Sequence, residues 1–243
     1  MLIDQDKCNG CGICVPYCPV GAITVSGKKA GIDLDICAEC GTCGRRYIVK
    51  CPTAAIYNDP NLFETERGVS KYFSDPMTTH KVTKIPGRGT EEVKTNDVTG
   101  RVKRGEIGIA LEMGRPCLGT TLAEVQKVTT ALARIGIVWE HMNPLSHIMD
   151  DPGTGTFPTR RLGLRMISCI IEFTAPAERL EAILTEVRRI AQELDTVFSL
   201  DLITQYDPAG HIPVLDQVER LGFAVRPNAK INLGLGRPLA EAQ

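Results

Sequence analysis

This chain has no long apolar run, few aromatic residues (5%) and no excess of charge of one sign. No run approaches the ~18 apolar residues of a membrane-spanning helix, and no signal peptide precedes the first motif. The sequence therefore predicts a cytoplasmic protein with no membrane partner. The formal net charge of −1 argues against nucleic acid held by bulk charge. Neither a nicotinamide fingerprint nor a Walker loop is found.

Cysteine is the residue that this chain has in quantity, and it is unevenly distributed. Eight of the ten cysteines lie in the first quarter of the chain. They form two runs, Cys8-x2-Cys11-x2-Cys14-x3-Cys18-Pro19 and Cys37-x2-Cys40-x2-Cys43-x7-Cys51-Pro52. Three cysteines at this spacing can wrap one face of a cubane cluster. A proline after the fourth helps to turn the chain away, because it fixes φ and has no N–H.

The two runs are halves of an internal repeat. Residues 3–8 match residues 32–37, and residues 18–23 match residues 51–56. The second run departs from the first in one place, because seven residues (44–50) precede its fourth cysteine where the first run has three. This insertion leaves open whether Cys51 reaches a cluster. Zinc sites, which use pairs of C-x2-C, and disulfides, which need an oxidising compartment, are the alternatives.

On these motifs, residues 1–58 resemble the two-cluster bacterial ferredoxin family. The resemblance implies two [4Fe–4S] clusters, electron transfer at low potential and an oxygen-sensitive, anaerobic setting. It also implies crossed ligation, in which the fourth cysteine of each run binds the other cluster. The implied ligands of cluster I are Cys8, Cys11, Cys14 and Cys51, and those of cluster II are Cys37, Cys40, Cys43 and Cys18.

Residues 59–105 show no sustained period and are expected to form either an extended linker or a docking loop. Their composition offers hydroxyls, amides and positive charge to an anionic ligand or a partner. The basic residues concerned are Lys84, Arg88, Lys94, Arg101, Lys103 and Arg104.

Residues 106–243 alternate between strand and helix patterns. Strands are predicted at 107–113, 137–139, 167–173 and 198–206, with helices at 121–135 and 176–194 between them. Thr121 and Glu124 form a capping box at the first helix. The order β-α-β, loop, β-α-β predicts an α+β fold. It would be a ferredoxin-like split βαβ sandwich, with an antiparallel sheet and two helices on one face. A helix at 213–221 and strands at 223–225 and 230–233 are expected to follow.

Several further polar residues are weaker site candidates. Residues 114–121 form a glycine-rich turn that could bind an anion or activate Cys117, although an ordinary turn is the simpler interpretation. Cys169 lies on the apolar face of a predicted strand and is interpreted as a core residue. The long loop contains four further polar residues, which are either solvent-exposed or form a second metal site. They are His141, His147, Asp150 and Asp151.

Two functions are compatible with these patterns. The first is an electron-transfer protein or subunit, which passes electrons to a partner oxidoreductase and belongs to an oligomer. The second is a reductase, because residues 89–101 and 232–239 resemble the ferredoxin-containing part of 6-hydroxynicotinate reductases. That resemblance implies flavin, on this chain or a partner, and an N-heterocyclic substrate, but it identifies no catalytic residue. A sensor with a ligand-binding domain is a third class, without a visible signalling element.

Overall fold

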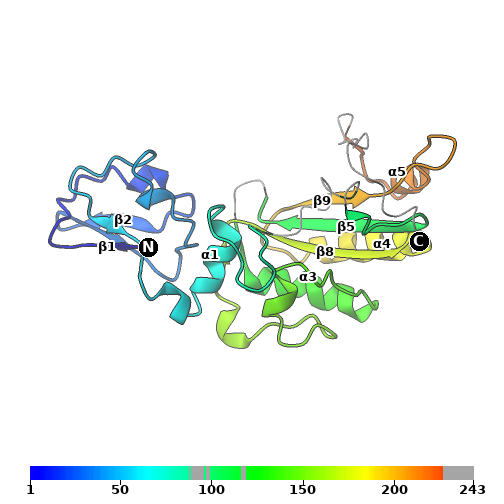
Figure 1. Cartoon of the computed structure of the whole chain (residues 1–243), viewed down its shortest axis with the longest axis horizontal. Coiled ribbons are helices and arrows are strands. Elements are labelled where there is room, and N and C mark those ends of the chain that lie inside the picture. Colours follow the sequence, from blue (N-terminus) through cyan, green and yellow to red (C-terminus); the bar gives the residue numbers. More distant parts are fainter. Residues whose placement is uncertain (87, 89–95, 97–98, 116–118, 227–243) are drawn as a thin grey trace.

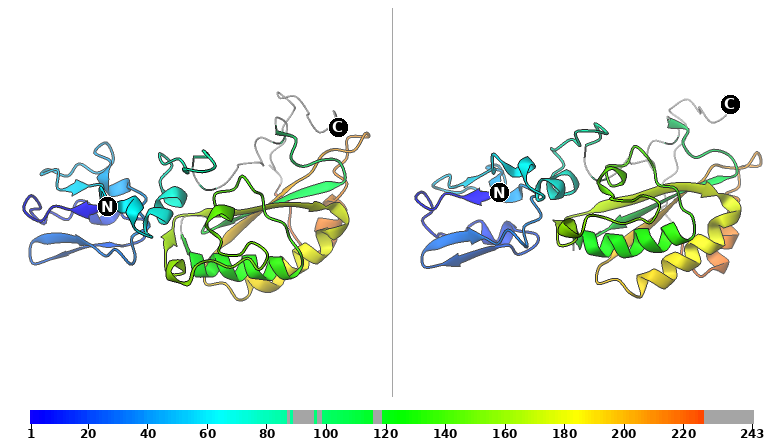
Figure 2. Two further views of the ribbon diagram at one scale, coloured as in Figure 1. Left: turned by 60° about the horizontal axis from the view of Figure 1, so that its bottom comes forward. Right: turned by 90° about the horizontal axis from the view of Figure 1, so that it is seen from below.

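The computed structural model describes residues 1–86, 88, 96, 99–115 and 119–226. A small N-terminal unit lies at one end of the molecule and a larger unit, built on a sheet, lies at the other (Figure 1). Helix α1 (Gly68–Ser74) lies between them (Figures 1 and 2). No helix in the described part of the chain is both long and apolar enough to cross a membrane.

The N-terminal unit is built from short strands and turns. Strand β1 (Leu2–Ile3) pairs with β4 (Ile56–Tyr57), and β2 (Ile23–Ser26) pairs with β3 (Lys29–Ile32), both antiparallel. Two short 3-10 helices, η1 (Val15–Tyr17) and η2 (Thr42–Gly44), follow or include the third cysteine of each run. The small buried core consists of Cys8, Cys14, Ile23, Ala30, Val49 and Ala55.

The connection from 59 onward is not structureless, contrary to the sequence-based expectation. It contains η3 (Leu62–Glu64) and α1, and a bridge pairs Thr79 with Pro86. Val69, Tyr72 and Phe73 pack on the core of the larger unit, and the Ile167 amide donates to Ser74 Oγ at 3.0 Å. A helix of seven residues is too short to show a clear hydrophobic period, so no pattern in the sequence marks it.

The larger unit is organised around the central strand β5 (Glu106–Met113). The strand order is β8-β5-β9, with β8 (Cys169–Pro176) and β9 (Phe198–Ile203) both antiparallel to β5. Helices α3 (Leu122–Arg134) and α4 (Leu180–Ala191) cover one face of this sheet (Figure 2). The remaining elements are β6 (Thr120–Thr121), η4 (Ser146–Ile148), η5 (Thr159–Arg161), β7 (Arg165–Met166), η6 (Ala177–Arg179) and α5 (Leu215–Arg220).

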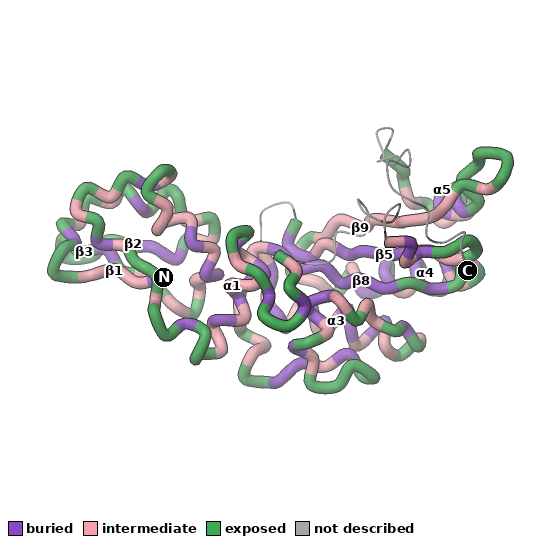
Figure 3. The backbone as a smooth tube through the Cα atoms, in the orientation of Figure 1, coloured by how far each residue is buried: buried purple, intermediate pink, exposed green. Residues whose placement is uncertain are grey.

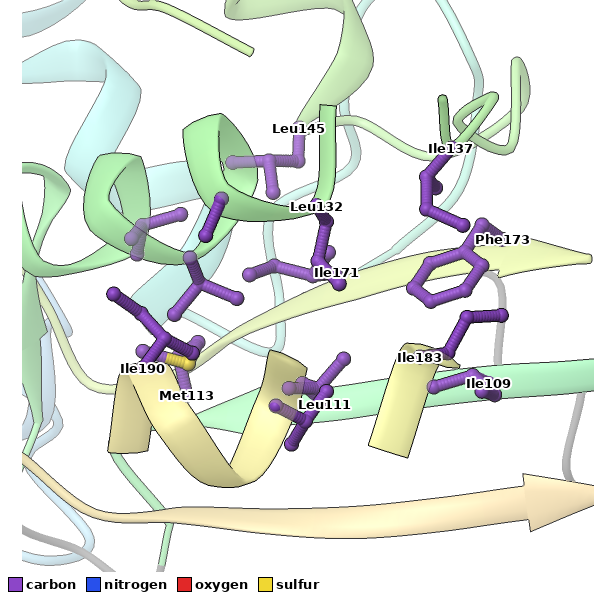
Figure 4. Packing of buried hydrophobic residues seen from close by; sticks show 14 of the residues in the cluster. Ile109, Leu111, Met113, Leu132, Ile137, Leu145, Ile171, Phe173, Ile183 and Ile190 are labelled. Atoms are coloured by element: carbon purple, nitrogen blue, oxygen red, sulfur yellow. The ribbon is translucent and has the colours of Figure 1, made fainter. Parts of the chain in front are cut away.

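The main core lies between the sheet and these two helices. Ile109, Leu111 and Met113 point from β5 toward α3 and α4, and Ile171 and Phe173 do so from β8 (Figure 4). Strands β5 and β8 are accordingly buried along most of their length (Figure 3). Burying one large apolar side chain contributes about 2 kcal/mol to stability. The core between the sheet and the two helices is therefore the principal source of stability.

The predicted elements mostly appear, with some corrections. Thr121 is confirmed as the N-cap, because the Glu124 amide donates to Thr121 Oγ1 at 3.3 Å, but the Glu124 carboxylate accepts from the Asp195 amide and pairs with Lys127. The strand expected at 137–139 is reduced to a single bridge between Trp139 and Phe173, with Val138 exposed. Residues 223–225 form no strand, and the strand expected at 230–233 lies outside the described residues. The chain is therefore a mixed helix and strand protein, as predicted.

Candidate iron–sulfur centre

Two pockets in the N-terminal unit collect the eight predicted cysteines. The space between the lining atoms, open solvent included, is about 320 Å³ in the first pocket and about 310 Å³ in the second. The cysteines that line the first are Cys8, Cys11, Cys14 and Cys51. The cysteines that line the second are Cys18, Cys37, Cys40 and Cys43. Each pocket thus has three cysteines from one run and one from the other.

The insertion at 44–50 does not keep Cys51 from the first pocket. Its residues fold into a turn in which the amides of Ile48 and Val49 both donate to the Arg45 carbonyl at 2.8 Å. Val49 is buried in the small core, whereas Tyr47 is exposed. The extra residues therefore form a surface bulge.

Backbone amides point at several of the sulfurs. The Ala30 amide donates to Cys8 Sγ at 3.3 Å, and the Ala22 amide donates to Cys18 Sγ at 3.2 Å. In the second run the Glu39 amide donates to Cys37 Sγ at 3.4 Å. Such bonds stabilise negative charge on a thiolate, and around a cluster they influence the reduction potential.

The ionisation of these thiols depends on burial. Burial raises the pKa of Cys37 to about 11 and that of Cys43 to about 12, and it also raises the pKa of Cys14. At Cys51 burial acts in the same direction, but amide and hydroxyl donors led by the Ala55 amide outweigh it and lower the pKa. Metal must bind thiolate, so loading the second pocket would release protons.

The donor set fits a cluster better than a single ion. In a tetrahedral zinc site the sulfurs lie roughly 3.8 Å apart, given Zn–S bonds of about 2.3 Å. Within the described residues, no three His, Cys, Asp or Glu side chains are grouped closely enough to hold one metal ion. Four thiols around an apolar pocket instead fit a [4Fe–4S] cluster, in which each iron takes one thiolate. The apolar lining, including Ile3 and Ile56 in the first pocket, limits access of water.

Near the second pocket lies a group of charges that the sequence analysis missed. Glu39 is fully buried, and its carboxylate pairs with the Met1 amino group and with Arg67 Nη1, the latter at 2.6 Å. Asp75 pairs with both Arg45 and Lys71. One signal was available, because Glu39 occupies the place in the second repeat that Gly10 has in the first.

The weaker candidates do not assemble into a second site. His147 Nε2 lies 2.9 Å from the His141 carbonyl, and Asp151 bonds locally to Gly153 and Thr154. Cys169 is fully buried and its pKa is raised by burial to about 12, which confirms the core interpretation. Cys117 and Lys94 lie outside the described residues.

One of the basic residues that were considered for a docking loop, Arg88, is bound to the larger unit. Arg88 Nη1 donates to Ser168 Oγ at 3.0 Å and lies 3.4 Å from Glu112 Oε2. Arg115, in the glycine-rich turn, lies 3.4 Å from the same carboxylate oxygen. These contacts account for both arginines within the larger unit.

Comparison with known proteins bears on the N-terminal unit. The model of the 4Fe-4S binding domain family matches residues 1–24. A ferredoxin-like protein in the vnf region of Azotobacter chroococcum mcd 1 is 43% identical over 53 residues, which cover 21% of this chain and 82% of that protein. Pyruvate synthase subunit PorD of Methanothermobacter marburgensis is 41% identical over 55 residues, or 23% of this chain and 59% of that protein.

The remaining comparisons limit what can be said of the rest. A protein of Archaeoglobus profundus that is named for its likeness to a heterodisulfide reductase subunit is 67% identical over 24 residues, only 3% of its length. No solved structure matches the chain. These comparisons give no support to a resemblance to 6-hydroxynicotinate reductases. By its cysteine-rich N-terminal unit, the chain belongs to the ferredoxin-like proteins that bind 4Fe–4S clusters.

Proposed function

We propose that this chain is an electron-transfer subunit with two [4Fe–4S] clusters, which passes low-potential electrons to a partner oxidoreductase. Cluster I would be bound by the cysteines of the first pocket and cluster II by those of the second. The clusters supply one-electron transfer when bound. The observation that carries the proposal is the grouping of the thiols, in which each pocket combines three cysteines of one run with the fourth of the other.

The residues around each pocket would stabilise a bound cluster and keep water from it. Amides directed at Cys8, Cys18 and Cys37 stabilise thiolate charge, and the apolar lining limits water. Cys11 is exposed at the surface, which gives an external carrier close access to cluster I. One relative is named as a pyruvate synthase subunit, and another is named for its likeness to a heterodisulfide reductase subunit. These names support a partner protein here.

We further propose a division into residues 1–58 for the clusters, 59–105 as the connection and 106–243 as a docking or oligomerisation domain. The order β8-β5-β9, together with the Trp139–Phe173 bridge outside β8, supports a split βαβ sandwich whose second strand is reduced to one bridge. No observation favours the alternative, a reductase with flavin or substrate bound in residues 106–243.

Native mass spectrometry of the protein, purified anaerobically from its source, tests the proposal. We expect a mass that accounts for about eight irons and eight sulfides per chain, within a complex that includes a cofactor-bearing second subunit. A chain that carries zinc, or no iron and sulfide, would refute the cluster assignment. A homo-oligomer with flavin and no second subunit would instead favour the reductase.

A further inference from the structure

The internal repeat predicts two equivalent clusters, but one residue breaks the equivalence. Gly10 and Glu39 occupy matching places in the two cysteine loops, and both have a left-handed φ, of +70° and +55°. In the first loop a side chain is impossible, because a Cβ on Gly10 would lie 2.2 Å from the Lys28 carbonyl oxygen. In the second loop the same place holds a carboxylate.

The left-handed conformation of Glu39 is a cost of about 1–2 kcal/mol for a residue other than glycine. Burying its charge would cost several more if the charge were unpaired. Both costs are offset by partners, because Arg67 Nη1 donates to Oε1 at 2.6 Å and the Met1 amino group pairs with Oε2. A strained and buried charge at this place indicates a role beyond local folding.

Glu39 lies between two of the cysteines that line the second pocket, Cys37 and Cys40, and its carboxylate pairs with the residue that precedes α1. Its own amide donates to Cys37 Sγ at 3.4 Å, and its partner Met1 lines the second pocket. Its other partner, Arg67, is the residue before α1, and Arg67 Nη2 also pairs with Asp59 at 2.8 Å. Among the described residues, the buried carboxylates are Glu39, Asp75 and Glu172, and none of them belongs to the first cysteine run.

We propose that Glu39 sets the reduction potential of cluster II apart from that of cluster I, and that Arg67 opposes its effect. The proposal rests on the cluster binding proposed above. Reduction adds negative charge to a cluster. A buried carboxylate beside it therefore disfavours reduction, and a half-buried guanidinium beside it favours reduction. Because the surroundings are apolar and water is scarce, these charges are weakly screened.

The test is a potentiometric titration of the loaded, full-length protein followed by EPR. Glu39→Gln should raise the potential of one cluster and leave the other unchanged. Arg67→Gln should lower the potential of that same cluster, and the double variant should return toward the wild-type value. Opposite signs distinguish electrostatics from loosening of the loop, which would shift both variants in the same direction.

Asp6→Asn is the matched control, because Asp6 is an exposed carboxylate two residues before Cys8. Water should screen it, so no shift is expected. Shifts of equal sign for Glu39→Gln and Arg67→Gln, no shift, or loss of half the iron from Glu39→Gln would overturn the inference. A wild-type protein with no reducible clusters would refute the proposed function instead, whereas two reducible clusters that neither variant moves would refute this inference alone.

Discussion

The two cysteine repeats share the C-x2-C-x2-C spacing of their first three cysteines, but different parts of the chain pack over them. The first loop is covered from within its own unit, where Lys29 Nζ donates to the Cys8 carbonyl at 2.7 Å and the Ala30 amide donates to Cys8 Sγ. The second loop is covered by charges on and beside α1, which also packs on the larger unit. A duplicated motif thus acquires different electrostatics from its neighbours.

This difference also decides which residue each loop can hold. The backbone turns left-handed at Gly10 and Glu39, and again at Gly21 and Ala54, so the geometry is repeated at both pairs. Only at Gly10 does a neighbouring backbone exclude a side chain. The backbone conformation at these places is therefore the same in both repeats. The residue type differs because different parts of the chain pack against each loop.

The largest expected effect comes from removing a ligand that crosses between the repeats. Cys18 belongs to the first run but lines the second pocket. Cys18→Ala should therefore remove about four of about eight irons and abolish the EPR signal of cluster II, not that of cluster I. Cluster-resolved EPR and iron analysis check this. Cys169→Ala is the control, because Cys169 is buried in the other core and should leave the iron content unchanged.

Loss of the signal from cluster I in Cys18→Ala would contradict crossed ligation. It would mean that each run binds its own cluster.

A smaller effect is expected from adding one methyl group to the first loop. Gly10→Ala places a Cβ against the Lys28 carbonyl, so the loop must move, and we expect cluster I to be lost or labile. Gly21→Ala has the same sign of φ but no atom within 4 Å of the added Cβ. It should cost only about 1 kcal/mol. Iron retention on dilution and thermal unfolding of the two variants measure the contrast.

Equal behaviour of the two alanine variants would show that the backbone conformation, and not the neighbouring carbonyl, excludes side chains from the first loop.

Much of the first repeat and of the larger unit could be predicted from the sequence. The resemblance of the cysteine runs to bacterial ferredoxins implied which thiols would meet, and the alternation in β5 and β8 predicted two strands with one buried face. These signals are local, because they depend on residues a few positions apart. The strand expected at 137–139 was wrong because three residues, one of them the exposed Val138, bury too little to hold an edge strand.

The charged residues on and beside α1 that pack over the second repeat could not be predicted in the same way. The Arg67–Glu39 and Arg45–Asp75 pairs join residues 28 and 30 positions apart. No period or motif marks such pairs, since each is decided by how α1 packs on the finished unit. The one available sign was a glutamate at the place of a repeated glycine.

A still smaller effect is expected from weakening the ion pairs of Asp75, which lie beside the second cysteine loop. Asp75→Asn leaves Lys71 and Arg45 without their anion in a buried setting, so we expect a loss of about 3 kcal/mol in unfolding free energy. Burial alone would raise the pKa of Asp75, but Lys71 and the Met77 amide outweigh it and lower the pKa. The stabilisation should therefore be present above about pH 3.8 and be lost as the pH falls further.

Denaturant unfolding of wild type and Asp75→Asn at neutral pH measures this loss. A variant as stable as wild type would show that Arg45 and Lys71 reach water or another anion once Asp75 is neutral, so that α1 would not depend on this pair.

The smallest effect is expected where the same connection is held by exposed charges. Glu66, two residues before α1, pairs with Arg160 at 2.6 Å and also with Arg161 of η5. Hydrogen bonds from Arg160 and Arg161 lower the pKa of Glu66, so its contribution exists above pH 4.5 and is lost as the pH falls through the folded pKa. Because Arg160 is exposed and Glu66 is partly exposed, Glu66→Gln should lower Tm by at most about 3 °C, and salt should abolish the difference. A loss of stability as large as that of Asp75→Asn, and unchanged by salt, would contradict this ranking. It would mean that the ion pairs at both ends of α1 contribute equally to stability, and that those beside the second pocket are not exceptional.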